Sequence, residues 1–152
     1  MIQAITLLVI AALVAIDQVI KIAVVNRFAA GGSMDILFGL IRIRYVENTG
    51  AAFSALSGSG LLLILLTAAL IIAAIMWYLR HGDCNRWLAA GVTLIVAGGL
   101  GNLYDRLTLG YVIDFIEVLF VRFAIFNVAD VAVVCGTVCL IIGILKTEGK
   151  AR

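Results

Sequence analysis

Four long apolar stretches constrain this chain more than any other feature of its sequence. They run from 5 to 25, 60 to 79, 87 to 104 and 123 to 145. A helix needs about 20 mainly apolar residues to cross the hydrocarbon core of a bilayer, so each stretch predicts one transmembrane helix. The composition agrees, because 64% of the 152 residues are hydrophobic and 13% are charged. In soluble domains, about 45–50% of the residues are apolar and about 25% are charged. We expect an all-α integral membrane protein of four transmembrane helices, forming a single membrane domain over residues 1–152.

The two long loops, 26–59 and 106–122, differ in character from the short polar turn 80–86. In the segment 40–46, Arg42 and Arg44 alternate with apolar residues, which predicts a half-buried strand. The segment 49–56 is typical of a short interfacial helix, and the run 112–120 is predicted to be extended. In an antiparallel bundle both loops lie on the same side of the membrane. The sequence therefore predicts a small β-element and a short interfacial helix on one face of the membrane.

Charge and cysteine content exclude several functions without fixing the orientation. The formal net charge is +2 with no basic run, so no nucleic-acid partner is expected. Three cysteines without a CxxC pair predict neither a disulfide framework nor a zinc site, and no metal or cofactor is expected. Lys and Arg number five on the side of the short turn and C-terminal tail and six on the other. The positive-inside rule thus does not decide the orientation.

Four acidic residues lie within the apolar stretches or close to their ends. Asp17 is in the first, Asp105 ends the third, Asp130 is near the start of the fourth, and Asp114 is in the loop between them. An Asp in the middle of a membrane costs roughly 2.5–3.5 kcal/mol or more, so such residues are functional candidates. In an up-down bundle these four positions converge on one side of the membrane.

Amide and guanidinium side chains accompany these carboxylates. Asn102, Asp105 and Arg106 have i, i+3, i+4 spacing and share one helix face, and Asn127 precedes Asp130 by three residues. Such carboxamides suit a network in which each buried polar group has a partner. We interpret Arg106 as the counter-ion of a buried carboxylate, with an anchor at the membrane interface as the alternative.

The carboxylates are the best candidates for catalytic groups. The single histidine, His81, is in the opposite loop, which excludes a Ser-His-Asp triad and disfavours a histidine-containing metal site near the aspartates. Two aspartates sharing one proton remain. Because two adjacent carboxylates do not both ionise readily, one serves as base and the other as acid. Such a pair could activate water against a peptide carbonyl and protonate the leaving amine.

Five segments in order resemble the signature of the lipoprotein signal peptidase family, also called signal peptidase II. The resemblance extends over the four helices and both loops, and is carried by DQVIK (17–21), NTGAAFS (48–54), GNLYDR (101–106), VIDF (112–115) and FNVAD (126–130). It implies an aspartic endopeptidase that removes the signal peptide from prolipoproteins carrying a diacylglyceryl-modified cysteine, with cleavage just before that cysteine.

The resemblance also implies the roles of individual residues. Asp114 and Asp130 would be the catalytic pair, and Asp105 is the competing candidate for a catalytic partner. Supporting roles around the pocket fall to Asp17, Asn48, Gly50, Asn102, Asp105, Arg106 and Asn127.

The same resemblance sets the expected location and partners. It implies a multi-pass protein of the bacterial cytoplasmic (inner) membrane, with both termini cytoplasmic and the active site near the outer face. The partners would be prolipoproteins and membrane lipids, and a monomer would suffice because one chain supplies both aspartates.

The main alternative is a small proton-coupled membrane transporter, since intramembrane carboxylates are what a proton relay requires. Transporters usually bind substrate near the midplane of the membrane. Here the acidic residues gather toward one face, beside a long structured loop, which favours an enzyme acting at the interface.

Overall fold

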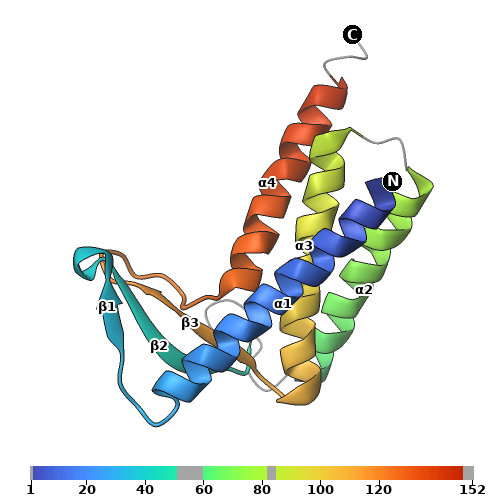
Figure 1. Ribbon diagram of the computed structural model, residues 1–152. Coiled ribbons are helices and arrows are strands. Elements are labelled where there is room, and N and C mark those ends of the chain that lie inside the picture. The colour runs from blue at the N-terminus through green and yellow to red at the C-terminus, as the bar shows by residue number, and fades with distance from the viewer. Residues whose placement is uncertain (1, 51–59, 82–84, 149–152) are drawn as a thin grey trace.

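Four long helices form the body of the protein, as the sequence predicts. The computed structural model describes residues 2–50, 60–81 and 85–148. Its helices are α1 (Ile2–Phe28), α2 (Gly60–Arg80), α3 (Arg86–Thr108) and α4 (Val128–Glu148). All four are long and apolar enough to cross a membrane. Helix α1 runs diagonally across the bundle, and the two ends of the chain lie toward the same end of it (Figure 1).

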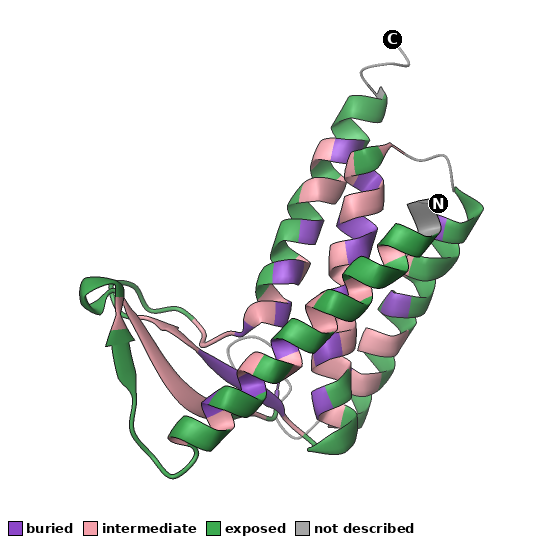
Figure 2. Ribbon diagram, viewed as in Figure 1, coloured by how far each residue is buried: buried purple, intermediate pink, exposed green. Residues whose placement is uncertain are grey.

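Burial is concentrated on α3, which packs against the other three helices. The outward faces of α1, α2 and α4 are largely exposed, as Figure 2 shows, although they carry leucine, isoleucine and valine. Leu8 and Leu70, for example, are both largely exposed. A monomeric soluble protein rarely exposes so much contiguous apolar surface. The pattern is the one expected where lipid, rather than water, surrounds the bundle.

Glycines allow α3 and α4 to approach one another closely. A Cβ atom added to Gly136 would lie 2.8 Å from the carbonyl oxygen of Gly91. A Cβ added to Gly98 would overlap the carbonyl oxygen of Ala129 and lie 2.8 Å from Cγ2 of Val133. Small residues at such positions bring helix backbones together in membranes. This contact fixes the start of α4 against α3.

Gly98→Ala is therefore expected to destabilise the bundle, because the backbone of Ala129 cannot move aside as a flexible side chain would. Overpacking of this kind typically costs about 1–3 kcal/mol. Gly60→Ala is the matched control, since a Cβ there meets nothing within 4 Å. Thermal unfolding in detergent should show a lowered Tm for Gly98→Ala alone. Equal Tm values for the two variants would argue against the close α3–α4 contact.

A three-stranded antiparallel sheet lies beside the end of the bundle away from the chain ends (Figure 1). Its strands, in spatial order, are β1 (Met34–Ile36), β2 (Ile41–Asn48) and β3 (Val112–Val118), with the 3-10 turn η1 (Leu37–Gly39) between the first two. The strand predicted at 40–46 and the extended run at 112–120 are confirmed as paired strands. Strand β1 is too short to carry an alternating pattern and is not predicted by the sequence.

The helices differ from the predicted approximate spans at several ends. Helix α4 begins at Val128 rather than at 123, because Phe126 pairs with Ile116 in an isolated β-bridge and holds the preceding chain extended. Helix α3 continues to Thr108 rather than 104, and α1 continues to Phe28 rather than 25. The predicted interfacial helix at 49–56 falls mainly on residues 51–59, which lie outside the described residues.

Candidate active site

Asp114 is placed by the pairing of β2 with β3. It lies opposite Val46, while Asn48 lies opposite Val112. Residues two apart on a strand point to the same face, so Asn48 and Asp114 are diagonal neighbours on one side of the sheet. The Nδ2 of Asn48 donates a hydrogen bond of 2.8 Å to Oδ2 of Asp114. The sheet thus carries this carboxylate to the bundle, where it is 2% exposed.

Asp130 lies in the first turn of α4 and forms a reciprocal cap with Asn127. The backbone N–H of Asn127 donates to Oδ2 of Asp130 at 3.1 Å, and the N–H of Asp130 donates to Oδ1 of Asn127 at 2.9 Å. This arrangement resembles a capping box, in which two unsatisfied donors of the helix start are satisfied together. The other carboxylate oxygen, Oδ1, accepts a hydrogen bond of 2.7 Å from Nδ2 of Asn102. Asp130 is thereby fixed at the helix end nearest the sheet.

Asn127 connects the two carboxylates. Besides capping α4, its fully buried side chain donates from Nδ2 to Oδ1 of Asp114 at 2.7 Å and to Oδ1 of Asn102 at 3.0 Å. Among the described residues, neither Asp114 nor Asp130 forms an ion pair. Each is held by amide groups, which orient a carboxylate without neutralising it.

Both carboxylates line one cavity of about 450 Å³. Its polar side is formed by the asparagine, aspartate and arginine side chains among the lining residues. Its remaining wall is mostly apolar and comes from the chain before α4 and from the first turns of that helix. The lining residues are Asn48, Asn102, Arg106, Val112, Asp114, Phe123, Ala124, Ile125, Phe126, Asp130, Val131, Val133, Val134 and Cys135.

Asp17 and Asp105 lie behind this cavity in a separate buried cluster around Lys21. The ammonium group of Lys21 is 2.8 Å from Oδ2 of Asp17 and 2.8 Å from Oδ2 of Asp105, and all three side chains are at most 2% exposed. Gln18 donates from Nε2 to Oδ1 of Asp105 at 2.9 Å. The backbone N–H of Ala129 donates to Oδ1 of Asp17 at 3.0 Å. Each of these two carboxylates therefore has a neutral hydrogen-bond donor and shares the charged group of Lys21.

Lys21 also connects this cluster to the candidate catalytic residues. Its ammonium donates to Oδ1 of Asn102 at 3.2 Å, and Asn127 donates to the same oxygen. With Oδ1 of Asn102 accepting both bonds, the Nδ2 group of Asn102 is directed to Asp130. The orientation of an amide that contacts Asp130 is thus set by a buried cation on another helix.

Arg106 forms no direct ion pair among the described residues, although its charge acts on Asp130, Asp114 and Asp105. Its guanidinium donates to the backbone carbonyls of Gly50, at 3.1 Å, and Asn102, at 3.5 Å. Gly50 in turn donates its N–H to Oδ1 of Asn48. Arg106 therefore ties the end of β2 to α3, and Lys21 is the cation in direct contact with the carboxylates of Asp17 and Asp105.

Sequence reasoning missed Lys21 and Gln18, although both lie in the first segment of the family signature. The available signal was the i, i+4 spacing of Asp17 and Lys21, which places opposite charges on one helix face. The remaining predicted residues, Asn48, Gly50, Asn102 and Asn127, all join the network around Asp114 and Asp130.

Burial dominates the electrostatics of Asp114. Loss of hydration disfavours its ionised form and raises its pKa to about 6. The hydrogen bonds from Asn48 and Asn127 oppose this effect, and the nearby carboxylate of Asp130 adds to it. Asp114 is therefore placed to gain or lose a proton near neutral pH.

This raised pKa predicts how stability changes with pH. The folded state holds the Asp114 proton more tightly than the unfolded chain, where the pKa is 3.8. Its contribution is fully present below about pH 4 and is lost as the pH rises through 6, a change of about 3 kcal/mol. We expect the Tm of Asp114→Asn, relative to that of the wild type, to increase as the pH rises from 4 to 7. A Tm difference that does not vary with pH would contradict the raised pKa.

Comparison with known proteins adds independent information. A family model described as signal peptidase (SPase) II matches residues 9–146. A lipoprotein signal peptidase of Streptococcus pneumoniae is 39% identical over 147 residues, which cover 96% of this chain and 95% of the relative. A lipoprotein signal peptidase of Lactiplantibacillus plantarum is 40% identical over 145 residues, covering 93% of this chain and 95% of the relative.

Two solved structures share the fold over nearly the whole chain. Both are described as bacterial membrane enzymes. One superposes with a TM-score of 0.88 at 28% identity, covering 98% of this chain and 92% of the other. The second has a TM-score of 0.85 at 31% identity, and the match covers 94% of each chain.

Proposed function

Since this chain belongs to the signal peptidase II family of proteases, which cleave signal peptides from prolipoproteins, we propose that it uses an aspartic mechanism with Asp114 and Asp130 as the catalytic pair. One observation carries the proposal. These two carboxylates line the same cavity, are joined through Asn127, and form no ion pair among the described residues.

The proposed reaction requires the pair to hold one proton. The ionised carboxylate takes a proton from a water molecule as the water oxygen attacks the scissile carbonyl carbon. The protonated carboxyl group donates its proton toward the carbonyl oxygen as negative charge develops there. The tetrahedral intermediate then collapses: one of its hydroxyl protons returns to the pair, the C–N bond breaks, and the amine leaves with the other proton of the pair. The products are a new carboxyl terminus on the signal peptide and a free amine on the mature lipoprotein.

The partners of the other two buried aspartates support this assignment. Asp17 and Asp105 are both paired with Lys21 at 2.8 Å, so neither is free to exchange a proton without breaking an ion pair. Neither lines the cavity of the catalytic pair. We assign Asp105 to the framework that orients Asn102, and not to the reaction.

The lining of the cavity supports a lipid-modified substrate. Phe123, Val131 and Val134 give it an apolar wall on the side of α4, opposite the polar network. We propose that the diacylglyceryl chains of the substrate cysteine contact this wall while the peptide bond before the cysteine reaches the carboxylates. Holding the substrate at both points raises the effective concentration of the reacting groups.

The turn η1, at the end of the sheet, supports the proposal that the active site lies at the membrane surface. Leu37 and Phe38 have positive φ values of 49° and 57°, an unfavourable conformation for apolar residues, and Phe38 is fully exposed. Lipid contact would account for such an apolar turn. We propose that the sheet rests on the outer surface of the cytoplasmic membrane, with both termini cytoplasmic.

Phe38→Asp should then weaken cleavage in lipid bilayers more than cleavage in detergent micelles. Equal effects in bilayers and micelles would oppose contact of this turn with lipid.

The experiment that tests the function uses the purified protein and a prolipoprotein with or without the diacylglyceryl group. Mass spectrometry of the products locates the cut. Cleavage just before the modified cysteine, with little cleavage of the unmodified protein, is expected. Cleavage elsewhere would overturn the proposed site of cutting. A folded protein that cleaves neither substrate, yet moves protons across liposome membranes, would favour the transporter instead.

A further inference from the structure

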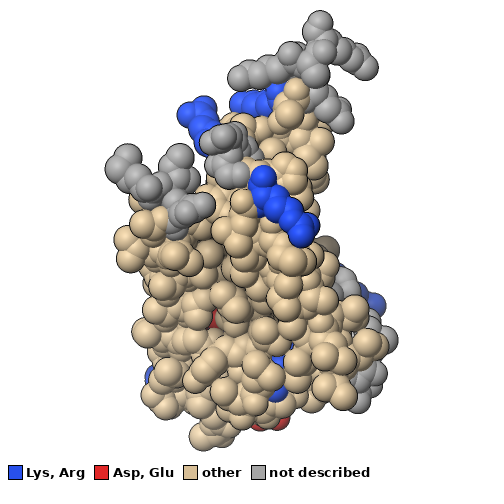
Figure 3. Space-filling view, turned by 90° about the vertical axis from the view of Figure 1, so that its right-hand side faces the viewer, with Lys and Arg blue, Asp and Glu red and all other residues tan. Residues whose placement is uncertain are grey.

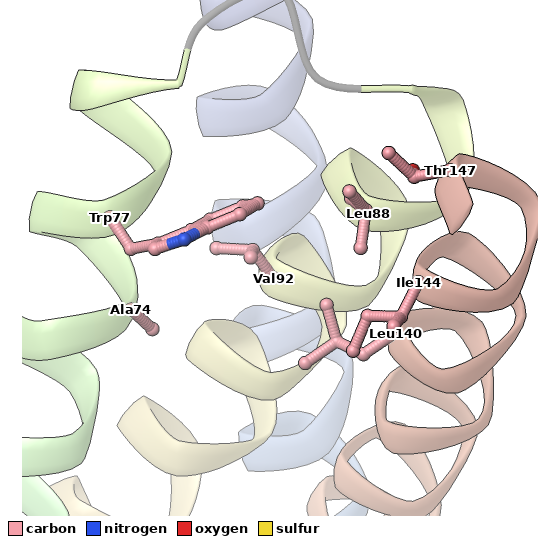
Figure 4. A pocket seen from close by; sticks show the side chains of 7 residues that line it. All are labelled: Ala74, Trp77, Leu88, Val92, Leu140, Ile144 and Thr147. Atoms are coloured by element: carbon pink, nitrogen blue, oxygen red, sulfur yellow. The ribbon is translucent and has the colours of Figure 1, made fainter. Parts of the chain in front are cut away.

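A second cavity lies in the bundle, at the end where the chain ends lie and away from the catalytic pair. It has a volume of about 490 Å³ and an almost wholly apolar lining from α2, α3 and α4. Figure 4 shows Trp77 extending from α2 toward Val92, with Leu140 and Ile144 on α4 across the opening. Sites for small ligands commonly have volumes of about 300–1,000 Å³. The space and its lining suit a hydrocarbon chain.

The indole ring of Trp77 is held in place on its outer side. It stacks on the imidazole of His81 with 4.8 Å between ring centroids and 17° between the planes. His81 Nδ1 is also 2.9 Å from the carbonyl oxygen of Trp77. The Trp77 ring that lines the cavity is therefore held by its stacking contact with His81.

Two exposed cations lie close in sequence to residues that line this cavity. Arg80 lies one turn after Trp77 on α2, and Lys146 precedes the lining residue Thr147 on α4. The Lys146 ammonium is 4.9 Å from the centroid of the Trp87 ring. Lys and Arg side chains lie toward this end of the bundle and again toward the opposite end, with a largely uncharged band between them (Figure 3). In the described part of the chain, neither Arg80 nor Lys146 is paired with a carboxylate.

We propose that this cavity binds one acyl chain of an anionic phospholipid, whose phosphate group lies against Arg80 and Lys146. An apolar cavity whose lining on α2 and α4 is closely followed or preceded by cations matches a molecule with a hydrocarbon tail and a negatively charged head. A zwitterionic phospholipid would fill the same space with a weaker charge interaction. Each basic residue near a membrane surface contributes about 1 kcal/mol toward anionic lipid, or about fivefold in affinity.

The chain contains two tryptophans, Trp77 and Trp87, so fluorescence reports on this cavity directly. In the Trp87→Phe variant, Trp77 is the remaining tryptophan. This variant would be placed in bilayers in which part of the lipid carries brominated acyl chains, which quench indole fluorescence. The brominated lipid would have either a phosphoglycerol or a phosphocholine headgroup. We expect brominated phosphoglycerol lipid to quench Trp77 fluorescence at a mole fraction about fivefold or more lower than brominated phosphocholine lipid requires.

Variants in the Trp87→Phe background separate a built site from ordinary lipid contact. Arg80→Gln should lower the preference for phosphoglycerol about fivefold, whereas Arg27→Gln, at the other end of the bundle, should leave it unchanged. Ala74→Phe should fill the cavity and reduce quenching by both lipids. Equal quenching by the two headgroups, insensitive to Arg80→Gln, would overturn the proposal. So would full quenching in a folded Ala74→Phe variant.

Discussion

Asp114→Asn is expected to lower kcat/KM on a diacylglyceryl-modified prolipoprotein by about 10²–10⁴-fold, the range associated with loss of a general acid or base. Asn keeps the shape of the side chain and can keep the contact with Asn127, but it cannot exchange a proton with water. The loss should appear in kcat, because the substrate-binding wall of the cavity does not depend on Asp114. Steady-state cleavage in detergent, followed by gel mobility of the product, measures it.

Asp35→Asn is the matched control for this prediction. Asp35 lies on β1 of the same sheet, is exposed, and is paired with Arg42 at 2.7 Å away from the cavity. The same chemical change there should leave kcat/KM within about twofold. An Asp114→Asn variant that cleaves within tenfold of the wild type would exclude Asp114 from the catalytic pair.

The largest expected effect on stability comes from Lys21→Met. Methionine has nearly the length of lysine, so packing is preserved while Asp17 and Asp105 lose their shared cation. Removing one partner of a buried ion pair costs about 3–5 kcal/mol, because a charge is left in a low-dielectric interior. That is a large part of the stability of a typical domain. Thermal unfolding in detergent should show a large fall in Tm.

Two further variants test the cause of that fall. Lys146→Met makes the same change at an exposed position that has no carboxylate partner among the described residues, and it should leave the Tm nearly unchanged. Adding Asp17→Asn and Asp105→Asn to Lys21→Met removes the stranded charges and should recover part of the lost stability. If the triple variant unfolds at a lower temperature than Lys21→Met, uncompensated charge is not the cause.

Patterns within single segments allowed the helices and strand β2 to be predicted. Twenty apolar residues suffice to indicate a spanning helix, and alternating arginines indicate a strand, without reference to the rest of the fold. The start of α4 was missed because Phe123 and Phe126 are as apolar as the helix that follows. The better signal was Asn127 three residues before Asp130, a pair suited to cap a helix start.

The candidate site was predictable as a set of residues but not as an arrangement. The cost of burying Asp17, Asp105 and Asp130 in an apolar chain pointed to them directly. Their division into two groups depends on contacts between distant segments. Lys21 meets Asp105 across 84 positions of the chain, and Asn48 meets Asp114 across the register of β2 and β3. No local pattern specifies which carboxylate receives the buried cation.

We propose that Asp114 and Asp130 carry out the reaction and do not merely hold the fold. The most direct test measures binding and single-turnover cleavage of the same lipid-modified prolipoprotein by wild type and Asp130→Asn. We predict a Kd within a few-fold of the wild type and a cleavage rate reduced by about 10²-fold or more. A variant that binds the substrate and cleaves it at the wild-type rate would contradict the assignment of the pair.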